Sequence, residues 1–220
     1  MISLVGSVSG RMPITQNSYV VHLLFTPLRR KPCRGKNANE DSHHSIRMVQ
    51  PGKEYLMDPL PIFSDPNYKP SNKLEGKVAL VIGGDSGIGR AVCYSFAKEG
   101  ATIAFTYVKG AEDIDAKYTL EIINDSKMSD AGDPIAIPTD VRYDKNCKDV
   151  VDKVVGTYGR IDVLVNNAAV QYETYTLDDI TEERLERIFR TNIFSHFFMT
   201  RHAVKHMKPG SSIINTASVL

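Results

Sequence analysis

The sequence predicts an α/β fold with a doubly wound parallel sheet, and two observations carry this prediction. From about residue 74 to the end of the chain, short apolar runs alternate with longer segments of helix-forming residues. The first apolar run breaks into a glycine-rich stretch, KVALVIGGDSGIGR over residues 77–90, which opens the first helix. Strands that alternate with helices are joined by right-handed crossovers and therefore lie parallel.

The expected elements follow one another in a regular order along the chain. The run at 78–82 is apolar throughout, as a strand covered on both faces requires. In total the sequence predicts strands at about 78–82, 101–107, 134–138, 161–165 and 211–215. Helices are expected between them, at about 90–99, 112–125, 145–158 and 182–207. We therefore expect an incomplete sheet of about five strands.

The glycine-rich stretch has the spacing of a dinucleotide-binding loop. Gly83 can adopt the backbone angles of a tight turn, Gly87 lets the main chain approach a pyrophosphate, and Gly89 lets the helix pack near the strand. The helix N-terminus adds free N–H groups and a partial positive charge. The spacing alone is equally compatible with an ordinary turn, so its surroundings decide. The other candidate cofactor-binding residues in this stretch are Asp85, Ser86, Ile88 and Arg90.

Four further signatures follow, three of them at the carboxyl ends of expected strands, where such sheets bind ligands. They are Asp140-Val141, Asn166-Asn167-Ala168-Ala169, Asn192 and Ser218. Together with the glycines, and in this order, they resemble the short-chain dehydrogenase/reductase family, which implies a Rossmann-type fold. From about residue 51 onward, PGKEYLMDPLP, YKPSNKLEGKVAL, GGDSGIGRAVCYSFAKEGA and NNAAVQ are similar to the plant glucose and ribitol dehydrogenase-like branch.

The resemblance implies a role for each of these residues, and each also has a plainer alternative. Asp140 would meet the adenine, or it would simply cap the next element. Asn166 would hold the sheet beside the nicotinamide ribose, or it would close a turn after the fourth strand. Asn192 is in helical register with an apolar stripe, so it faces inward. It would position a water in a proton relay, or make a structural hydrogen bond.

Ser218 matches the family's serine, which would hydrogen-bond the substrate oxygen during hydride transfer. In the family its partner is a Tyr with a Lys four residues later, and the Lys lowers the Tyr pKa from its usual value of about 10. No such pair follows Ser218 in this sequence, so we expect a C-terminally truncated chain with little turnover. Tyr94 and Lys98 have that spacing, but they precede the serine and lie on the first helix. Gln171 and Tyr172 are further candidates for shaping a substrate pocket.

The choice between the two nicotinamide cofactors is partly readable. An acid at the end of the second strand would bind the ribose hydroxyls of NAD and repel the phosphate of NADP. Thr106-Tyr107 stand there instead, with Lys109 nearby and Arg90 beside the glycines. The sequence therefore favours NADP, or the use of both cofactors, with Tyr107 among the binding residues. Ile82 replaces the Thr that the family has before the first glycine, which leaves the backbone cradle intact.

The resemblance thus implies an NAD(P)-dependent oxidoreductase that moves hydride between the cofactor and an alcohol or carbonyl substrate, with a sugar or polyol suggested by the branch. The alternative is a non-catalytic dinucleotide-binding remnant. A formal charge of +1, from 27 Lys+Arg and 26 Asp+Glu, predicts neither a nucleic-acid nor a membrane partner. No metal is expected, since His43-His44 and the pair His202 and His206 lack an evident third ligand. A homo-oligomer is expected of a full-length protein.

Three regions are expected along the chain. A basic, acid-poor tail spans 1–50, a proline-rich extended arm spans 51–73, and an NAD(P)-binding domain without its C-terminal part spans 74–220. The tail has no acid before Glu40, which is typical of a transit peptide, or of a disordered tail or an incorrectly extended start. We expect a cytoplasmic protein, or a plastid or mitochondrial one if the tail is a targeting segment.

Two expectations concern stability and redox state. With five strands, one edge of the sheet would be uncovered, and the last helix would expose an apolar face, so we expect a marginal, aggregation-prone protein. That face carries Phe189, Ile193, Phe197 or Phe198. The three cysteines are odd in number and widely spaced, which fits reduced thiols better than disulfides. They are Cys33, Cys93 and Cys147.

Overall fold

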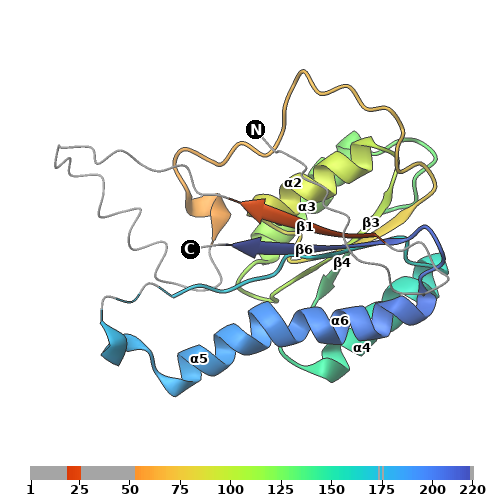
Figure 1. Ribbon diagram of the computed structural model, residues 1–220. Helices are drawn as coiled ribbons and strands as arrows, with labels where there is room; N and C mark the ends of the chain where they lie inside the picture. The colour runs from red at the N-terminus through yellow and green to blue at the C-terminus, as the bar shows by residue number, and fades with distance from the viewer. Residues whose placement is uncertain (1–18, 26–52, 173, 175, 219–220) are drawn as a thin grey trace.

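The computed structural model describes residues 53–172, 174 and 176–218, together with the backbone of residues 19–25. These residues form a six-stranded parallel sheet with helices on both faces (Figure 1). The strands are β1 (Tyr19–Phe25), β2 (Val78–Ile82), β3 (Thr102–Tyr107), β4 (Ile135–Pro138), β5 (Val163–Asn166) and β6 (Ser212–Ser218). Their order across the sheet is β1-β6-β5-β2-β3-β4. The predicted α/β, doubly wound class is therefore confirmed.

The helices lie between the strands, close to the predicted ranges. They are α2 (Gly87–Lys98), α3 (Asp113–Ser126), α4 (Asp144–Tyr158), α5 (Glu182–Phe189) and α6 (Ser195–Ala203). Short turns of other helix types are η1 (Glu54–Leu56), η2 (Leu177–Asp179), η3 (Arg190–Phe194) and η4 (Val204–His206), of which η3 is π-helical. No helix among the described residues is long and apolar enough to cross a membrane.

Both faces of β2 are buried, which explains its uninterrupted apolar sequence. Its alternate residues contribute to two separate cores, because successive side chains of a strand point to opposite faces. Leu80 packs in the core that α4 and α6 cover, and Val81 packs in the core that α2 and α3 cover. Cys93 and Cys147 are buried free thiols, one in each core, and burial raises the pKa of Cys147 to about 12.

The strand order places a topological switch point between β2 and β5. After β2 the chain builds β3 and β4 on one side, and it then crosses to place β5 and β6 on the other. In the register of the sheet, Ile82 at the end of β2 lies opposite Asn166 at the end of β5. In open α/β sheets the crevice outside the strand ends at such a point is where ligands bind.

The strand β1 is the main departure from the sequence-based expectation. It comes from the region expected to be an irregular tail, and it pairs in parallel with β6 from Tyr19 opposite Ser212 to Phe25 opposite Ser218. The expectation of an uncovered edge beside β6 is therefore wrong. β6 also runs past the predicted end at residue 215, because β5 pairs with it as far as Asn215 whereas β1 pairs with it as far as Ser218. The rest of the tail, with Cys33 and His43-His44, lies outside the described residues.

The long helix predicted at 182–207 is present as a continuous helical run with a change of pitch in its middle. In η3 the N–H of Ser195 donates to the carbonyl of Arg190, five residues earlier, as in a π-helix. As expected, the run leaves large apolar side chains exposed. They are Phe189, Ile193 and Phe197, with Phe197 71% exposed, whereas Phe198 packs against the core.

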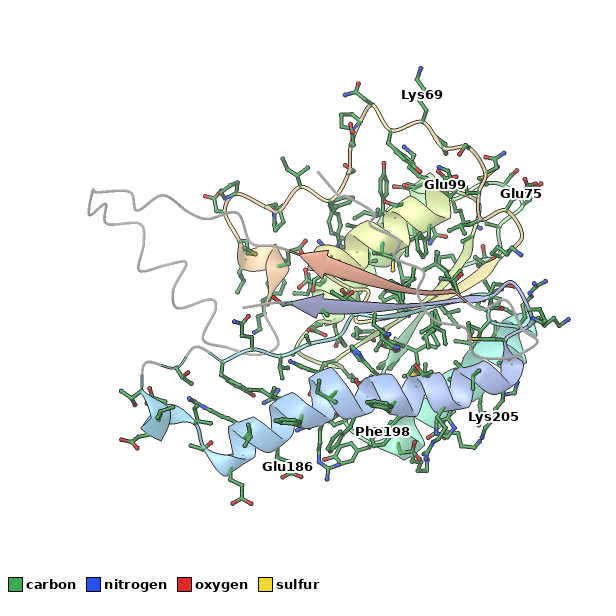
Figure 2. All side chains as sticks on the ribbon, viewed as in Figure 1. Lys69, Glu75, Glu99, Glu186, Phe198 and Lys205 are labelled. Atoms are coloured by element: carbon green, nitrogen blue, oxygen red, sulfur yellow. The ribbon has the colours of Figure 1, made fainter. Side chains whose placement is uncertain are left out.

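The arm before β2 lies along α2 and α3 (Figure 2). Phe63 meets the ring of Tyr94 edge-on at 5.5 Å, and the Nζ of Lys98 lies 5.3 Å from the same ring. The Nζ of Lys98 also lies 5.8 Å from the ring of Tyr68 in the arm, so Tyr94 and Lys98 both contact the arm. At the C-terminal end of α2, Glu99 accepts hydrogen bonds from the backbone N–H groups of Ser71 and Lys73, at 3.1 and 2.9 Å. Burial opposes the charge of Glu99, but these bonds and one from Tyr68 lower its pKa to about 2.

Candidate dinucleotide-binding site

The glycine loop between β2 and α2 has the geometry that each glycine was expected to provide. Gly83 has a φ of +72°, and a Cβ on it would lie 2.9 Å from the Cα of Ala168. A Cβ on Gly89 would lie 1.8 Å from the carbonyl oxygen of Gly83, so this position requires glycine for helix-to-strand packing. Gly87 has a φ of +51° and no atom within 4 Å of its Cβ position. The loop is therefore closed on its inner side and open at Gly87.

Asn167 joins the glycine loop to the neighbouring strands. Its Nδ2 donates to the carbonyl of Gly83 at 3.0 Å, and its Oδ1 accepts from the hydroxyl of Thr216 at 3.1 Å. The side chain thus connects the ends of β2, β5 and β6 across the switch point. Ala168, beside it, packs against Gly83, and Ala169 is exposed.

Asn166 is completely buried at the end of β5. Its Nδ2 donates to the Oδ1 of Asn215 at 2.9 Å and to the hydroxyl of Thr200 at 3.2 Å. Its Oδ1 is buried and has no hydrogen-bond partner among the described residues. These contacts tie β5 to β6 and α6, so Asn166 holds the sheet together at the end of β5.

Asn192 lies in the π-helical turn η3 and is hydrogen-bonded to the loop that follows β5. Its Nδ2 donates to the carbonyl of Val170 at 2.9 Å, and its Oδ1 accepts from the N–H of Val170 at 2.8 Å. The donor and the acceptor of the Asn192 side-chain amide are therefore both bonded to the backbone of Val170. The geometry favours the structural hydrogen-bonding role for this side chain over direct contact with a relay water.

Asp140 and its neighbour lie just beyond β4. The Asp140 carboxylate accepts from Arg142 at Nε and Nη2, at 2.9 and 2.5 Å, and its backbone carbonyl accepts from Asn146 at 2.9 Å. Burial opposes the charge, but the bonds from Arg142 lower the pKa of Asp140. Val141 is buried against α4. Asp140 thus anchors the start of α4, and any contact with an adenine would be made by a carboxylate already paired with Arg142.

Two predicted residues end strands near the site. Ser218 is exposed at the last position of β6, three residues beyond Asn215. Tyr107 is the last residue of β3, and burial and the charge of Asp113 raise its pKa. Ser86 is the N-cap residue of α2 but makes no side-chain capping bond, and the side chain of Ile88 is 41% exposed.

Asp85 and Arg90 lie in the interior instead of at the open face. The Asp85 carbonyl accepts from Arg90 at Nε and Nη2, at 3.0 and 2.6 Å, and from the hydroxyl of Thr119 at 2.7 Å. Burial raises the pKa of the Asp85 carboxyl to about 6. Arg90 is 2% exposed and forms ion pairs with Glu54 and Asp115. The charge of Arg90 is therefore neutralised inside the protein, although the sequence analysis took Arg90 as support for binding the phosphate of NADP.

The structure adds an acid that sequence reasoning missed at the end of β3. Glu112 precedes α3, and its Oε2 accepts from the N–H of Val108 at 2.7 Å. It is 8% exposed, and burial raises its pKa to about 7. The sequence has no acid directly after the strand, whereas this carboxylate reaches back from the residue before α3. Glu54 was also missed, since nothing in its local sequence indicates that the arm reaches the glycine loop.

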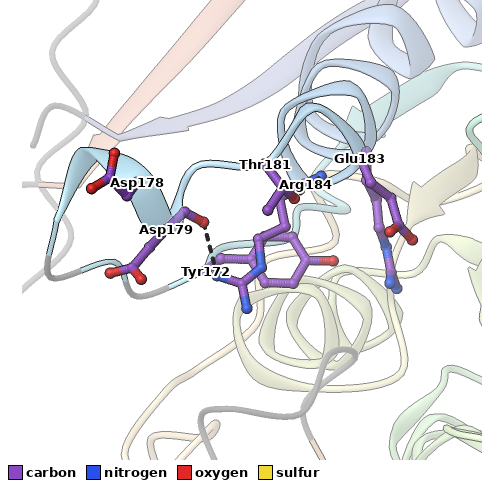
Figure 3. A pocket seen from close by; sticks show the side chains of 7 residues that line it. Tyr172, Asp178, Asp179, Thr181, Glu183 and Arg184 are labelled. Carbon is purple, nitrogen blue, oxygen red and sulfur yellow. Dashed lines mark hydrogen bonds between the residues drawn. The ribbon is translucent and has the colours of Figure 1, made fainter.

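A cavity of about 500 Å³ opens between the loop after β5 and the start of α5 (Figure 3). The guanidinium carbons of Arg184 and Arg187 lie 5.4 and 5.9 Å from the ring centroid of Tyr172. The residues that line the cavity include Tyr172, Asp178, Thr181, Glu183, Arg184 and Arg187. Of the two residues expected to shape a substrate pocket, Tyr172 lines this cavity and Gln171 is exposed.

Comparison with known proteins identifies the family to which the chain belongs. Residues 77–220 match the family model for short chain dehydrogenase, so the chain belongs to that family. It is 68% identical over 170 residues to a glucose and ribitol dehydrogenase of Daucus carota, covering 77% of this chain and 58% of that protein. It is 67% identical over 171 residues to the chloroplastic NADPH-dependent aldehyde reductase 1 of Arabidopsis thaliana, covering 78% of this chain and 59% of that one.

Solved structures show the same relationship. A short chain dehydrogenase from Burkholderia cenocepacia in complex with NADP aligns with a TM-score of 0.58 and 32% identity, over 65% of this chain and 56% of that one. A short-chain dehydrogenase/reductase from Serratia marcescens aligns with a TM-score of 0.58 and 32% identity, over 64% of this chain and 55% of that one. The chain thus spans under two thirds of the length of these relatives.

Proposed function

We propose that this chain forms the cofactor-binding part of an NAD(P)-dependent oxidoreductase. The observation that carries the proposal is the glycine loop, which lies at the β2–β5 switch point and is held there by the bond from Asn167 to the Gly83 carbonyl. The inner face of this loop has no room for side chains, and its outer face at Gly87 is open. A backbone cradle of this kind fits a pyrophosphate at a helix N-terminus.

The residues of this chain would bind and orient the cofactor. The N–H groups that begin α2 would hold the pyrophosphate, and the buried network of Asn166 and Asn167 would keep the crevice rigid. When bound, the reduced nicotinamide would supply the hydride to a carbonyl, and the oxidised nicotinamide would accept it from an alcohol. Ser218, at the end of β6, would hydrogen-bond the oxygen of an alcohol or carbonyl substrate.

We propose NADP(H) as the preferred cofactor, with NAD(H) also accepted. The name of the Arabidopsis relative and the NADP complex of the Burkholderia structure support this choice. Lys109 follows β3, where the adenosine ribose is read in such folds. When ionised, Glu112 at the same strand end opposes a phosphate, and its pKa of about 7 makes that opposition depend on pH.

We propose a sugar, polyol or aldehyde as the substrate class, and a homo-oligomer as the assembly. The names of the two plant relatives support the substrate class. The exposed phenylalanines of α5 and α6 support self-association, because apolar patches of this kind are normally covered. Neither proposal depends on the other.

The test is titration of the purified protein with NADPH and NADH, with the fluorescence of the reduced nicotinamide as the measure of binding. We expect saturable binding of both cofactors, with the lower Kd for NADPH. Reduction of glyceraldehyde and oxidation of glucose or ribitol would then be assayed on the same preparation. Failure of both dinucleotides to bind would contradict the proposal.

A further inference from the structure

The arm that precedes the domain reaches the glycine loop through one side chain, Glu54. This residue begins η1 and is 6% exposed. Its Oε2 accepts from the N–H of Gly87, and its Oε1 accepts from the Nη1 of Arg90. Gly87 is the first residue of α2, so its N–H has no partner within the helix. A carboxylate from 33 residues earlier in the chain therefore caps the cofactor-binding helix.

The cap that Ser86 would normally provide is missing, which makes the contact with Glu54 informative. Ser86 occupies the N-cap position with extended backbone angles, yet its side chain makes no capping bond. Apart from its chain neighbours and its own helix, Gly87 has no atom within 4 Å of its Cβ position, so no other segment packs against that side of the residue. The bond to Glu54 is thus a specific restraint on a residue that the loop itself leaves free.

Glu54 is in turn fixed by a buried network that joins the arm, α2 and α3. The Nη2 of Arg90 donates to the Oδ1 of Asp115 at 3.1 Å, and the N–H of Glu54 donates to the Oδ2 of Asp115 at 3.2 Å. The exposed fractions of Arg90 and Asp115 are 2% and 1%. Two carboxylates share one guanidinium, and the positive end of α2 offsets the remaining charge.

We propose that Glu54 is a positioning residue of the dinucleotide site, an inference that rests on the proposed function. It holds the Gly87 amide and the first turn of α2 in the bound conformation, which leaves the N–H groups of Ile88 and Gly89 aimed at the pyrophosphate. A loop that is ordered before binding loses less entropy when the ligand arrives. The carboxylate does not compete with the pyrophosphate, because Arg90 and the Gly87 amide already satisfy it.

The chain offers a matched control in Glu99. Glu99 is a buried carboxylate that fastens the same arm, but it does so at the far end of α2 through Ser71 and Lys73. The substitution Glu99→Gln therefore loosens the arm without touching the glycine loop. The substitution Glu54→Gln keeps the shape of the side chain and removes its charge.

The experiment measures the Kd for NADPH and for ADP, together with the Tm, in the wild type, E54Q and E99Q. We expect E54Q to raise both Kd values roughly tenfold. We expect E99Q to lower the Tm and leave both Kd values within about twofold of the wild type. A loss on ADP would place the effect in the ADP half of the cofactor and away from the nicotinamide.

Three results would overturn the inference. They are an unchanged Kd in E54Q, tighter binding in E54Q, and equal losses in E54Q and E99Q. Tighter binding would mean that the carboxylate competes with the pyrophosphate, and equal losses would mean that the arm acts through general docking. If the wild type binds no dinucleotide, the proposed function fails, whereas an unchanged Kd in E54Q contradicts the role of Glu54 alone.

A second measurement needs no variant and no nucleotide. In the unliganded wild type we expect the Gly87 amide, bonded to Glu54, to exchange with solvent more slowly than the Ile88 amide. Equal exchange rates at Gly87 and Ile88 would contradict the restraint by Glu54, even if E54Q fails to fold.

Discussion

The carbonyl oxygen of Gly83 accepts a hydrogen bond of 3.0 Å from the side-chain amide of Asn167, 84 residues further along the chain. Gly83 begins the glycine loop after β2, and Asn167 follows β5. Through Thr216 the same amide also reaches β6. One side chain therefore sets the position of the glycine loop relative to the two strands that form the other wall of the crevice.

Replacing Asn167 with Ala removes this connection. We expect a loss of about 1 to 3 kcal/mol in the free energy of unfolding, because the Gly83 carbonyl and the Thr216 hydroxyl lose their partner. We also expect weaker NADPH binding, measured by fluorescence titration beside urea unfolding. Thr216→Val, which leaves the Gly83 bond in place, is the control and should bind nearly as the wild type does. Equal Kd values for N167A and the wild type would contradict this prediction.

Replacing Gly89 with Ala places a methyl group where the Gly83 carbonyl oxygen lies, 1.8 Å away. The backbone must shift, so we expect loss of NADPH binding and a lower Tm. Gly156→Ala is the matched control, since Gly156 lies inside α4 with nothing within 4 Å of its Cβ position. That change should stabilise the protein by about 0.5 to 1 kcal/mol. Wild-type binding by G89A would show that the close approach is not required.

The acid Glu112 makes stability depend on pH. Burial raises the pKa of Glu112 to about 7 from its usual value of 4.5, so the carboxyl group loses its proton at a lower pH in the unfolded chain than in the folded protein. The stability that the protonated form contributes is present below about pH 4.5 and is lost through pH 7. We expect the free energy of unfolding of the wild type to fall relative to that of E112Q, by on the order of 2 kcal/mol between pH 5 and pH 8. Urea unfolding at both pH values tests this, and parallel profiles would contradict it.

The pairing of β1 with β6 is tested by proline at two consecutive positions, Val21 and His22. Consecutive N–H groups of a strand point to opposite sides, and β1 has a neighbour on one side. We expect one of V21P and H22P to lose a ladder bond, unfold more easily by about 1 kcal/mol or more and aggregate, while the other is tolerated. The Tm measures the change in stability, and light scattering measures aggregation. If both variants match the wild type, residues 19–25 do not form this strand in solution.

Much of the fold could be predicted because its causes are local. The apolar run of β2 indicated a strand covered on both faces, and the glycine spacing indicated the turn into α2; the structure has both. Helix α2 begins three residues before the predicted start, because its first turn is made of the glycine loop itself. The site was less complete. Gly83 of the loop meets Asn167 just after β5, but Arg90 turns inward to two acids that sequence spacing could not identify.

The sequence by itself determined the order of strands and helices and the positions that must be glycine, because periodicity and backbone sterics act between near neighbours. The tertiary structure decided which distant segments meet. It brought Glu54 from the arm to the amide of Gly87, and it placed residues 19–25 along β6. It also turned Glu112 back to the end of β3. These contacts depend on carboxylates that must find partners when they are buried, and on unpaired backbone N–H and C=O groups at the edge of the sheet. The buried environment and the sheet edge exist only once the chain has folded.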